Sequence, residues 1–159
     1  MLNYKMVCSN FANALSKITA PKLPNNNEFV PFTSVDQNAW KLQADGSLKC
    51  CNAGEWQVIA QYQIVGQNDI SSGANGTIEA WFIINDKNVA DSGATAYVSK
   101  KGGSAVLTIV LNEAFKKGDN LKLGIRSTSV DGKLNSACVA SVGQSGVGIP
   151  SVILALDKI

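Results

Sequence analysis

Apolar and polar residues alternate along much of the chain from about residue 29 onward. The clearest run covers residues 56–64, where the even-numbered positions are apolar or aromatic and most odd-numbered positions are glutamine. Successive side chains of a strand point to opposite faces, so this period of two predicts a strand with one buried face. A second run at 78–84 has the same period, with Ala80 and Phe82 on one face and Trp81 on the other. Both runs are therefore predicted strands.

Shorter stretches with the same character are separated by turn residues. They predict strands at 29–33, 40–43, 48–51, 89–91, 94–99, 106–111, 121–126 and 147–158. Asparagine and aspartate accept the left-handed backbone of tight turns, so turns are expected at 85–88 and 118–120. Eight to ten short strands with no helical pattern between them predict an all-β, antiparallel sandwich or jelly roll.

The first 28 residues follow a different pattern. Apolar residues recur there at helical spacing before a proline that would end a helix; these residues are Val7, Phe11, Ala14, Ile18 and Pro21. Residues 21–27 are rich in proline and asparagine, which predicts a linker. We therefore expect a short N-terminal helix and linker in residues 1–28 and the β-domain in residues 29–159. Such a helix could pack on its own domain or dock onto another protein.

The composition narrows the class of function. Apolar residues make up 45% and charged residues 16%, which is typical of a folded chain. The chain has no histidine, so the imidazole base of serine and cysteine hydrolases is missing, and we expect no enzyme. The net charge is only +2, and Arg126 is the single arginine. Nucleic-acid binding is not expected, because it needs a concentrated basic patch.

The four cysteines, Cys8, Cys50, Cys51 and Cys138, fit no C-x-x-C ligand pair. Reduced thiols are the favoured interpretation, and oxidation stays open. The first 18 residues lack the apolar core of a secretory signal, and no apolar stretch is long enough to span a membrane. We therefore expect synthesis in the cytoplasm without membrane insertion, or else a fragment cut from a larger exported protein.

Three segments, at 54–58 (GEWQV), 81–89 (WFIINDKNV) and 114–123 (AFKKGDNLKL), occur in an order that resembles the C1q and tumour-necrosis-factor-like jelly rolls. Asp86 stands where that family usually has glycine in its hairpin, and the closing Gly-Phe pair of C1q domains is missing. The sequence is therefore more similar to microbial and viral surface members of the superfamily. The resemblance implies a homotrimer. Because some relatives bind calcium, calcium stays open as a cofactor although no ligands can be named, and no other cofactor is expected.

Residues 106–111 are apolar on both strand faces, which suggests that one face is buried in the sandwich and the other against a second subunit. Side chains on such strands are candidates for the three-fold contact: Tyr62, Trp81 and Val110. The alternative is that all three fill the core of the sandwich.

These features together predict a non-enzymatic, trimeric jelly-roll protein on the surface of a particle, with a virion as the first candidate. It would serve as a capsid, spike, decoration or host-attachment protein, and residues 1–28 could dock it to other particle proteins. The first alternative is a lectin that binds a cell-surface glycan or receptor. Trp40 and Tyr97 are its candidate contacts, because aromatic rings stack on sugars, although the same rings could belong to the core. The second alternative is a secreted cytokine-like ligand.

Overall fold

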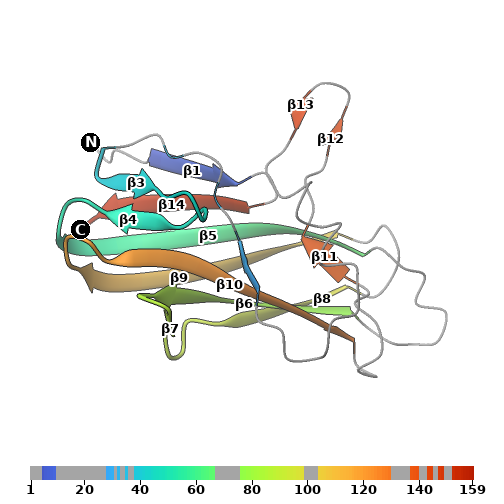
Figure 1. Ribbon diagram of the computed structural model, residues 1–159. Helices are drawn as coiled ribbons and strands as arrows, with labels where there is room; N and C mark the ends of the chain where they lie inside the picture. The colour runs from blue at the N-terminus through green and yellow to red at the C-terminus, as the bar shows by residue number, and fades with distance from the viewer. Residues whose placement is uncertain are drawn as a thin grey trace.

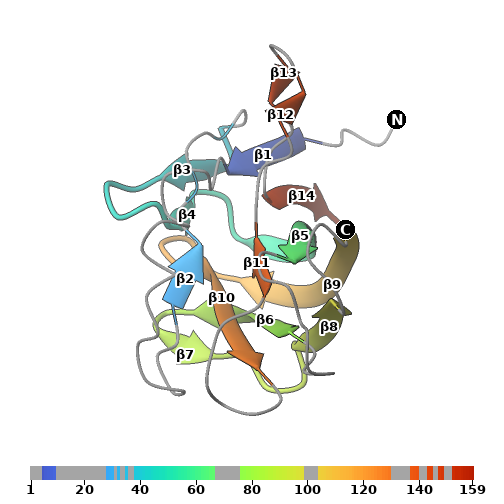
Figure 2. The same cartoon turned by 90° about the vertical axis from the view of Figure 1, so that its right-hand side faces the viewer.

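Every regular element in the described part of the chain is a β-strand, and all strand pairs are antiparallel, which confirms the all-β prediction. The strands stack in two layers (Figures 1 and 2). This computed structural model describes residues 5–9, 28–30, 32, 35, 38–66, 76–98, 104–129, 137–139, 143–144, 147–148 and 152–159.

The first layer, sheet A, is built around one long central strand. Its strands are β1 (Lys5–Ser9), β5 (Gly54–Gly66), β9 (Ser104–Phe115), β11 (Ala137–Val139) and β14 (Val152–Lys158). Strand β5 pairs with β9 along one edge and with β14 along the other. Strand β14 pairs in turn with β1, and β11 pairs with the last residues of β5. Sheet A therefore depends on β5 for both of its long pairings.

The second layer, sheet B, is centred on two neighbouring strands. It contains β2 (Glu28–Val30), β3 (Trp40–Leu42), β4 (Leu48–Cys50), β6 (Gly76–Ile84), β7 (Lys87–Asn88), β8 (Ala94–Val98) and β10 (Asn120–Ser129). Strand β6 pairs with β10 along nine residue pairs and also with β7 and β8. Strands β2 and β4 pair with the far edge of β10. A separate short pair joins β12 (Gly143–Gln144) and β13 (Val147–Gly148).

Most predicted strands are present, several with longer or shorter bounds, but two predictions differ more from the structure. The strand expected at 89–91 is wrong, because the paired residues are Lys87 and Asn88, and Asp91 has a positive φ of 56° in the turn that follows. The single strand expected at 147–158 is divided between β13 and β14. The turn expected at 85–88 is confirmed at Asn85 and Asp86, whereas Lys87 and Asn88 form β7. Asn85 and Asp86 both have positive φ, as a two-residue type I′ hairpin requires.

The N-terminal segment meets the sandwich directly. Residues Lys5–Ser9 form β1 and pair with β14 in the register Val7 to Leu154. Part of the segment that was expected to precede the β-domain is therefore a strand of sheet A. The predicted helix includes Val7, but Val7 lies in this strand. The remaining positions of that helix, from residue 10 to residue 20, lie outside the described residues.

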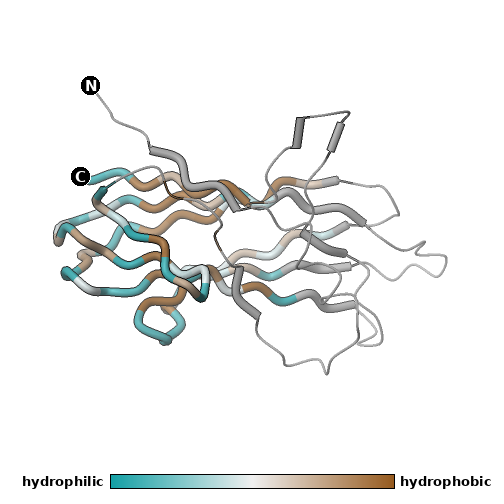
Figure 3. Tube along the Cα trace, turned by 45° about the horizontal axis from the view of Figure 1, so that its top comes forward, coloured by the Kyte–Doolittle hydropathy of each residue, from teal (hydrophilic) through white to brown (hydrophobic). Residues whose placement is uncertain are grey.

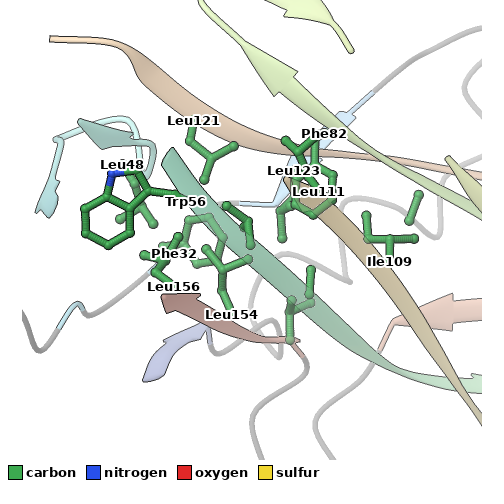
Figure 4. Close-up of a cluster of buried hydrophobic side chains, with 14 of the residues drawn as sticks. Phe32, Leu48, Trp56, Phe82, Ile109, Leu111, Leu121, Leu123, Leu154 and Leu156 are labelled. Carbon is green, nitrogen blue, oxygen red and sulfur yellow. The ribbon is translucent and has the colours of Figure 1, made fainter. Parts of the chain in front are cut away.

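The core fills the space between the inner faces of the two sheets. Alternate residues of the long strands β5, β6, β9, β10 and β14 enter it, and Figure 4 shows these side chains meeting between β5, β9, β10 and β14. Fully buried examples are Val58, Ala60 and Leu154 from sheet A and Phe82 and Leu123 from sheet B. In Figure 3 hydrophobic residues follow the strands, whereas the turns near the C-terminus are hydrophilic. Burial of these apolar faces is the main stabilising contribution to the fold.

Three aromatic rings close the core at the end where β3 and β4 lie. The ring of Trp40 meets Trp56 edge-on, with 5.5 Å between centroids, and meets Phe115 edge-on at 5.0 Å. Edge-to-face pairs add to the gain from burial, because the positive ring edge faces the negative ring face. Trp40 and Phe115 belong to strands of different sheets, so this cluster joins the two layers.

Polar side chains join two turns at the same end of the sandwich. The Asn85 amide donates to Asp119 Oδ1 at 2.9 Å, and the Asn85 side-chain oxygen accepts from the Asn120 backbone N–H at 2.9 Å. The Lys116 backbone N–H donates to Asp119 Oδ2 at 2.7 Å. These hydrogen bonds, led by the one from Asn85, hold the pKa of Asp119 below its ordinary value. The β6–β7 turn is therefore tied to the β9–β10 turn through an ionised carboxylate.

Truncation of one inward and one outward side chain tests the assignment of faces. Leu123→Ala should lower the free energy of unfolding by about 2–5 kcal/mol, because it leaves a cavity in the core. Ile83→Ala removes the same number of carbons from the outer face of the neighbouring strand, where Ile83 is half-buried, and should cost clearly less. Urea denaturation measures both values. Equal losses would contradict the alternation described for sheet B.

The Asp119 contacts predict a specific dependence on pH. Because the folded-state pKa lies below that of the unfolded chain, the carboxylate stabilises the fold above about pH 4. That stabilisation is lost as the pH falls through the folded-state pKa. The difference in unfolding free energy between the native chain and Asp119→Asn should therefore be largest near neutral pH and should shrink below pH 4. A difference that grows on acidification would show that the ionised group does not stabilise this turn.

Candidate functional site

The structure separates the five residues that the sequence singled out. Tyr62 and Trp40 are buried, with 0% and 1% of their surface exposed, whereas Val110 and Tyr97 are 52% and 65% exposed. Trp81 lies between these extremes and is half-buried. Val110 lies on the outer face of sheet A, but Trp81 and Tyr97 lie on the outer face of sheet B. The two sheets form different layers of the sandwich (Figure 1). The three candidates for the three-fold contact therefore do not share one surface.

Tyr62 and Trp40 belong to the core rather than to a binding surface. Tyr62 follows Val58 and Ala60 along the inner face of β5, so the period of two turns it inward. Burial raises the pKa of its hydroxyl well above the ordinary range. Trp40 packs against Trp56 and Phe115. Neither side chain has surface to offer to another subunit or to a sugar, and the core alternative holds for both.

The outer face of sheet A carries an apolar strip across three strands. Val110 lies opposite Ile59, and Ile59 lies opposite Ala155, so their side chains share one row. Ile153 lies two positions before Ala155 on β14, so its side chain is on the same face. Ile59, Ile153 and Ala155 are half-buried. We call Ile59, Val110, Ile153 and Ala155 the sheet A strip.

The outer face of sheet B carries a shallow hollow of about 200 Å³ beside Trp81. The Trp81 indole lies over Gly124, its cross-strand partner, because a Cβ at Gly124 would overlap the indole ring. The indole N–H donates to Asn88 Oδ1 at 2.9 Å. These two contacts fix the ring against the sheet. We call this feature the Trp81 hollow; its lining residues are Glu79, Trp81, Asn88, Val89 and Arg126.

A charged pair forms one wall of the Trp81 hollow. Arg126 lies opposite Glu79 across β10 and β6, and its Nε donates to Glu79 Oε2 at 2.8 Å. Arg126 Nη2 donates to the same oxygen. The two side chains are 35% and 33% exposed, so the pair is partly desolvated but still reachable from solvent. Among the described residues, no donor is bonded to Glu79 Oε1.

These lining residues are not recognisable as a site from the sequence alone. Glu79 and Arg126 are 47 residues apart, and Gly124 is distant from Trp81 in the chain. Only the β6–β10 register brings them together. The single available signal was that Arg126 is the only arginine in the chain.

A second hollow, of about 270 Å³, lies at one end of sheet A. Its lining residues are Glu55, Asn112, Glu113, Ala114 and Ile159. It combines two carboxylates with an exposed apolar residue and has no aromatic wall. The Trp81 hollow therefore offers the richer set of contacts to a ligand.

Two cysteines, Cys50 and Cys51, are free thiols. Burial is the main cause that raises the pKa of the Cys50 thiol, which favours the unreactive protonated form. In the part of the chain that the structure describes, no cluster of three or more acidic, cysteine or histidine side chains is placed to bind a metal ion. Within the same residues, no helix has the length and apolar character needed to cross a membrane.

No protein-family model matches the chain, and no curated protein matches it either.

Alanine substitution at two glycines tests how Trp81 is held. Gly124→Ala should displace the indole from β10 and lower stability by about 1–3 kcal/mol, because the new methyl group overpacks the contact. Trp40 and Trp56 are buried, so an increase in iodide quenching of tryptophan fluorescence would show that Trp81 has become more accessible to solvent. Gly93→Ala is the matched control. Its Cβ would lie 3.4 Å from the Ala80 carbonyl oxygen and 3.7 Å from Trp81 Cβ, which are ordinary contacts. Unchanged quenching in Gly124→Ala would contradict the described packing.

Proposed function

We propose that this chain is a non-enzymatic jelly-roll protein that assembles as a homotrimer and forms or decorates the surface of a particle. The strand pairing supports the jelly roll. Taken in chain order, the eight strands β1, β4, β5, β6, β8, β9, β10 and β14 pair first with last, second with seventh, third with sixth and fourth with fifth. A jelly roll has this connectivity, because its eight strands form four antiparallel pairs that are distributed over two sheets.

The sheet A strip is the observation that carries the trimer. Sheet A already buries its inner face in the sandwich, yet its outer face presents apolar side chains on three adjacent strands. Contiguous apolar surface on a soluble protein favours a contact with another chain. The resemblance of segments 54–58, 81–89 and 114–123 to C1q and tumour-necrosis-factor-like domains favours three copies around an axis. Of the three residues first expected at this contact, we retain Val110.

The particle setting rests on the resemblance to microbial and viral surface domains. A virion is the setting we propose, and residues 1–28 are the segment we expect to dock to other particle proteins. Within that segment, Lys5–Ser9 pairs with β14 and Glu28 pairs with β10, so we propose the contact for residues 1–4 and 10–27. Detection of the chain in purified particles of its source tests this setting, and its absence from them would overturn it.

The oligomeric state provides the direct test of the trimer. Light scattering after size exclusion should give three times the 16.8 kDa chain mass. Val110→Lys should raise the dissociation constant by about tenfold or more, because it places a charge in an apolar contact. Thr95→Lys is the matched control: it also replaces an exposed β-branched strand residue with lysine, but on the outer face of sheet B. A stable monomer at micromolar concentration, or equal effects of the two variants, would contradict the proposal.

A further inference from the structure

We propose that the Trp81 hollow is a binding site for a neutral oligosaccharide. The site lies on sheet B, so it does not depend on the sheet A strip or on the number of subunits. It also differs from the pair first considered for a lectin, because Trp40 is buried in the core and only Tyr97 remains on the surface.

The aromatic platform is the first argument. Trp81 is half-buried and lies over Gly124, so the sheet holds the ring in place before any ligand arrives. The bond from the indole N–H to Asn88 also restricts rotation of the ring. A ring that is already ordered loses little conformational entropy on binding. An ordered, partly exposed indole offers an apolar surface on which the C–H face of a pyranose ring can stack.

The Glu79–Arg126 pair, which forms one wall of the Trp81 hollow, is the second argument. It favours a neutral ligand. Glu79 and Arg126 form an ion pair with no net charge. Within the described part of the chain, the bonds from the guanidinium go to Glu79 Oε2, so Oε1 can accept a hydrogen bond from a ligand and other guanidinium N–H groups can donate to one. A sugar carries vicinal hydroxyls that both donate and accept, which matches this wall. An anionic ligand would gain from Arg126 but would be repelled by Glu79.

The position of Tyr97 indicates that more than one sugar ring is bound. Tyr97 lies opposite Thr77 on β8, on the same outer face as Glu79 and Trp81. Trp81 lies four positions after Thr77 on β6, which corresponds to roughly 13 Å along the strand. The Glu79–Arg126 pair lies between these two positions. The face thus offers two aromatic contacts with a polar pair between them, an arrangement that fits an extended oligosaccharide.

Tryptophan fluorescence gives a direct assay, because only Trp81 of the three tryptophans has substantial exposed surface. We would titrate the full chain with maltotriose, cellotriose, mannotriose, chitotriose and a galactose-terminated N-glycan, with sialyllactose as the anionic comparison. At least one neutral oligosaccharide should protect Trp81 from iodide quenching in a saturable manner. The best member of the panel distinguishes a polysaccharide source from a cell-surface glycan. Failure of every neutral member would overturn the proposal.

Two carboxylate-to-amide variants then separate a neutral site from an anion site. Glu79→Gln should weaken binding of the best neutral oligosaccharide by about tenfold, because a charged acceptor is lost. Asp157→Asn makes the same change on sheet A and should leave the affinity unchanged. If Glu79→Gln instead binds sialyllactose more tightly than the native chain does, Arg126 serves an anion and the neutral assignment is wrong. Equal affinities of the native chain, Glu79→Gln and Asp157→Asn for the neutral oligosaccharide would show that Glu79 does not contact the ligand.

A surface variant keeps the test decisive if Glu79→Gln fails to fold. Tyr97 is 65% exposed, so Tyr97→Ala should fold normally. It should weaken trisaccharide binding by about three- to tenfold and leave monosaccharide binding unchanged, as measured by calorimetry. Unchanged trisaccharide affinity would remove Tyr97 from the site and with it the extended ligand. The result is independent of the light-scattering measurement, so failure of this site and failure of the trimer can be told apart.

Discussion

Strand β5 and its two long pairings are the constraint on which the rest of the structure depends. Its inward residues form the centre of the core, and its edges hold β9 and β14. Because side chains alternate between faces, a shift of either partner by one residue would exchange the buried and exposed sets. Leu111 and Leu156 are buried in this register, and the same register places Val110 and Ala155 on the outer face. The core and the sheet A strip are thus two consequences of one pairing.

The two outer faces differ in chemistry although the two inner faces are alike. Sheet A presents a row of aliphatic side chains, whereas the exposed part of sheet B combines an indole, an ion pair and amide groups. This aliphatic row, which has polar neighbours such as Gln61 and Thr108 on the same face, suits a contact between copies because its burial stabilises association. A mixed aromatic and polar face suits a ligand with directional groups. The proposed assembly and the proposed recognition therefore use different surfaces and do not compete.

The contact between Trp81 and Gly124 shows how a missing side chain can shape a surface. Glycine weakens a strand interior because it has no side chain to pack and retains more freedom in the unfolded chain. Here the indole of the neighbouring strand covers that position. The contact stabilises the strand pair and also creates a flat, ordered ring at the surface. A structural requirement and a binding platform thus coincide at one cross-strand pair.

The sequence by itself predicted the all-β class, most strands and a hairpin turn at residues 85–88, because these depend on local periodicity and backbone preference. It left open whether Tyr62 lies in the core or at an interface, and whether Trp40 lies in the core or contacts a sugar. It also could not join Glu79 to Arg126 or Trp81 to Gly124. Those contacts depend on the register between strands far apart in the chain, and register is set by the packing of the whole core. Only the tertiary structure therefore decided where the candidate surfaces lie.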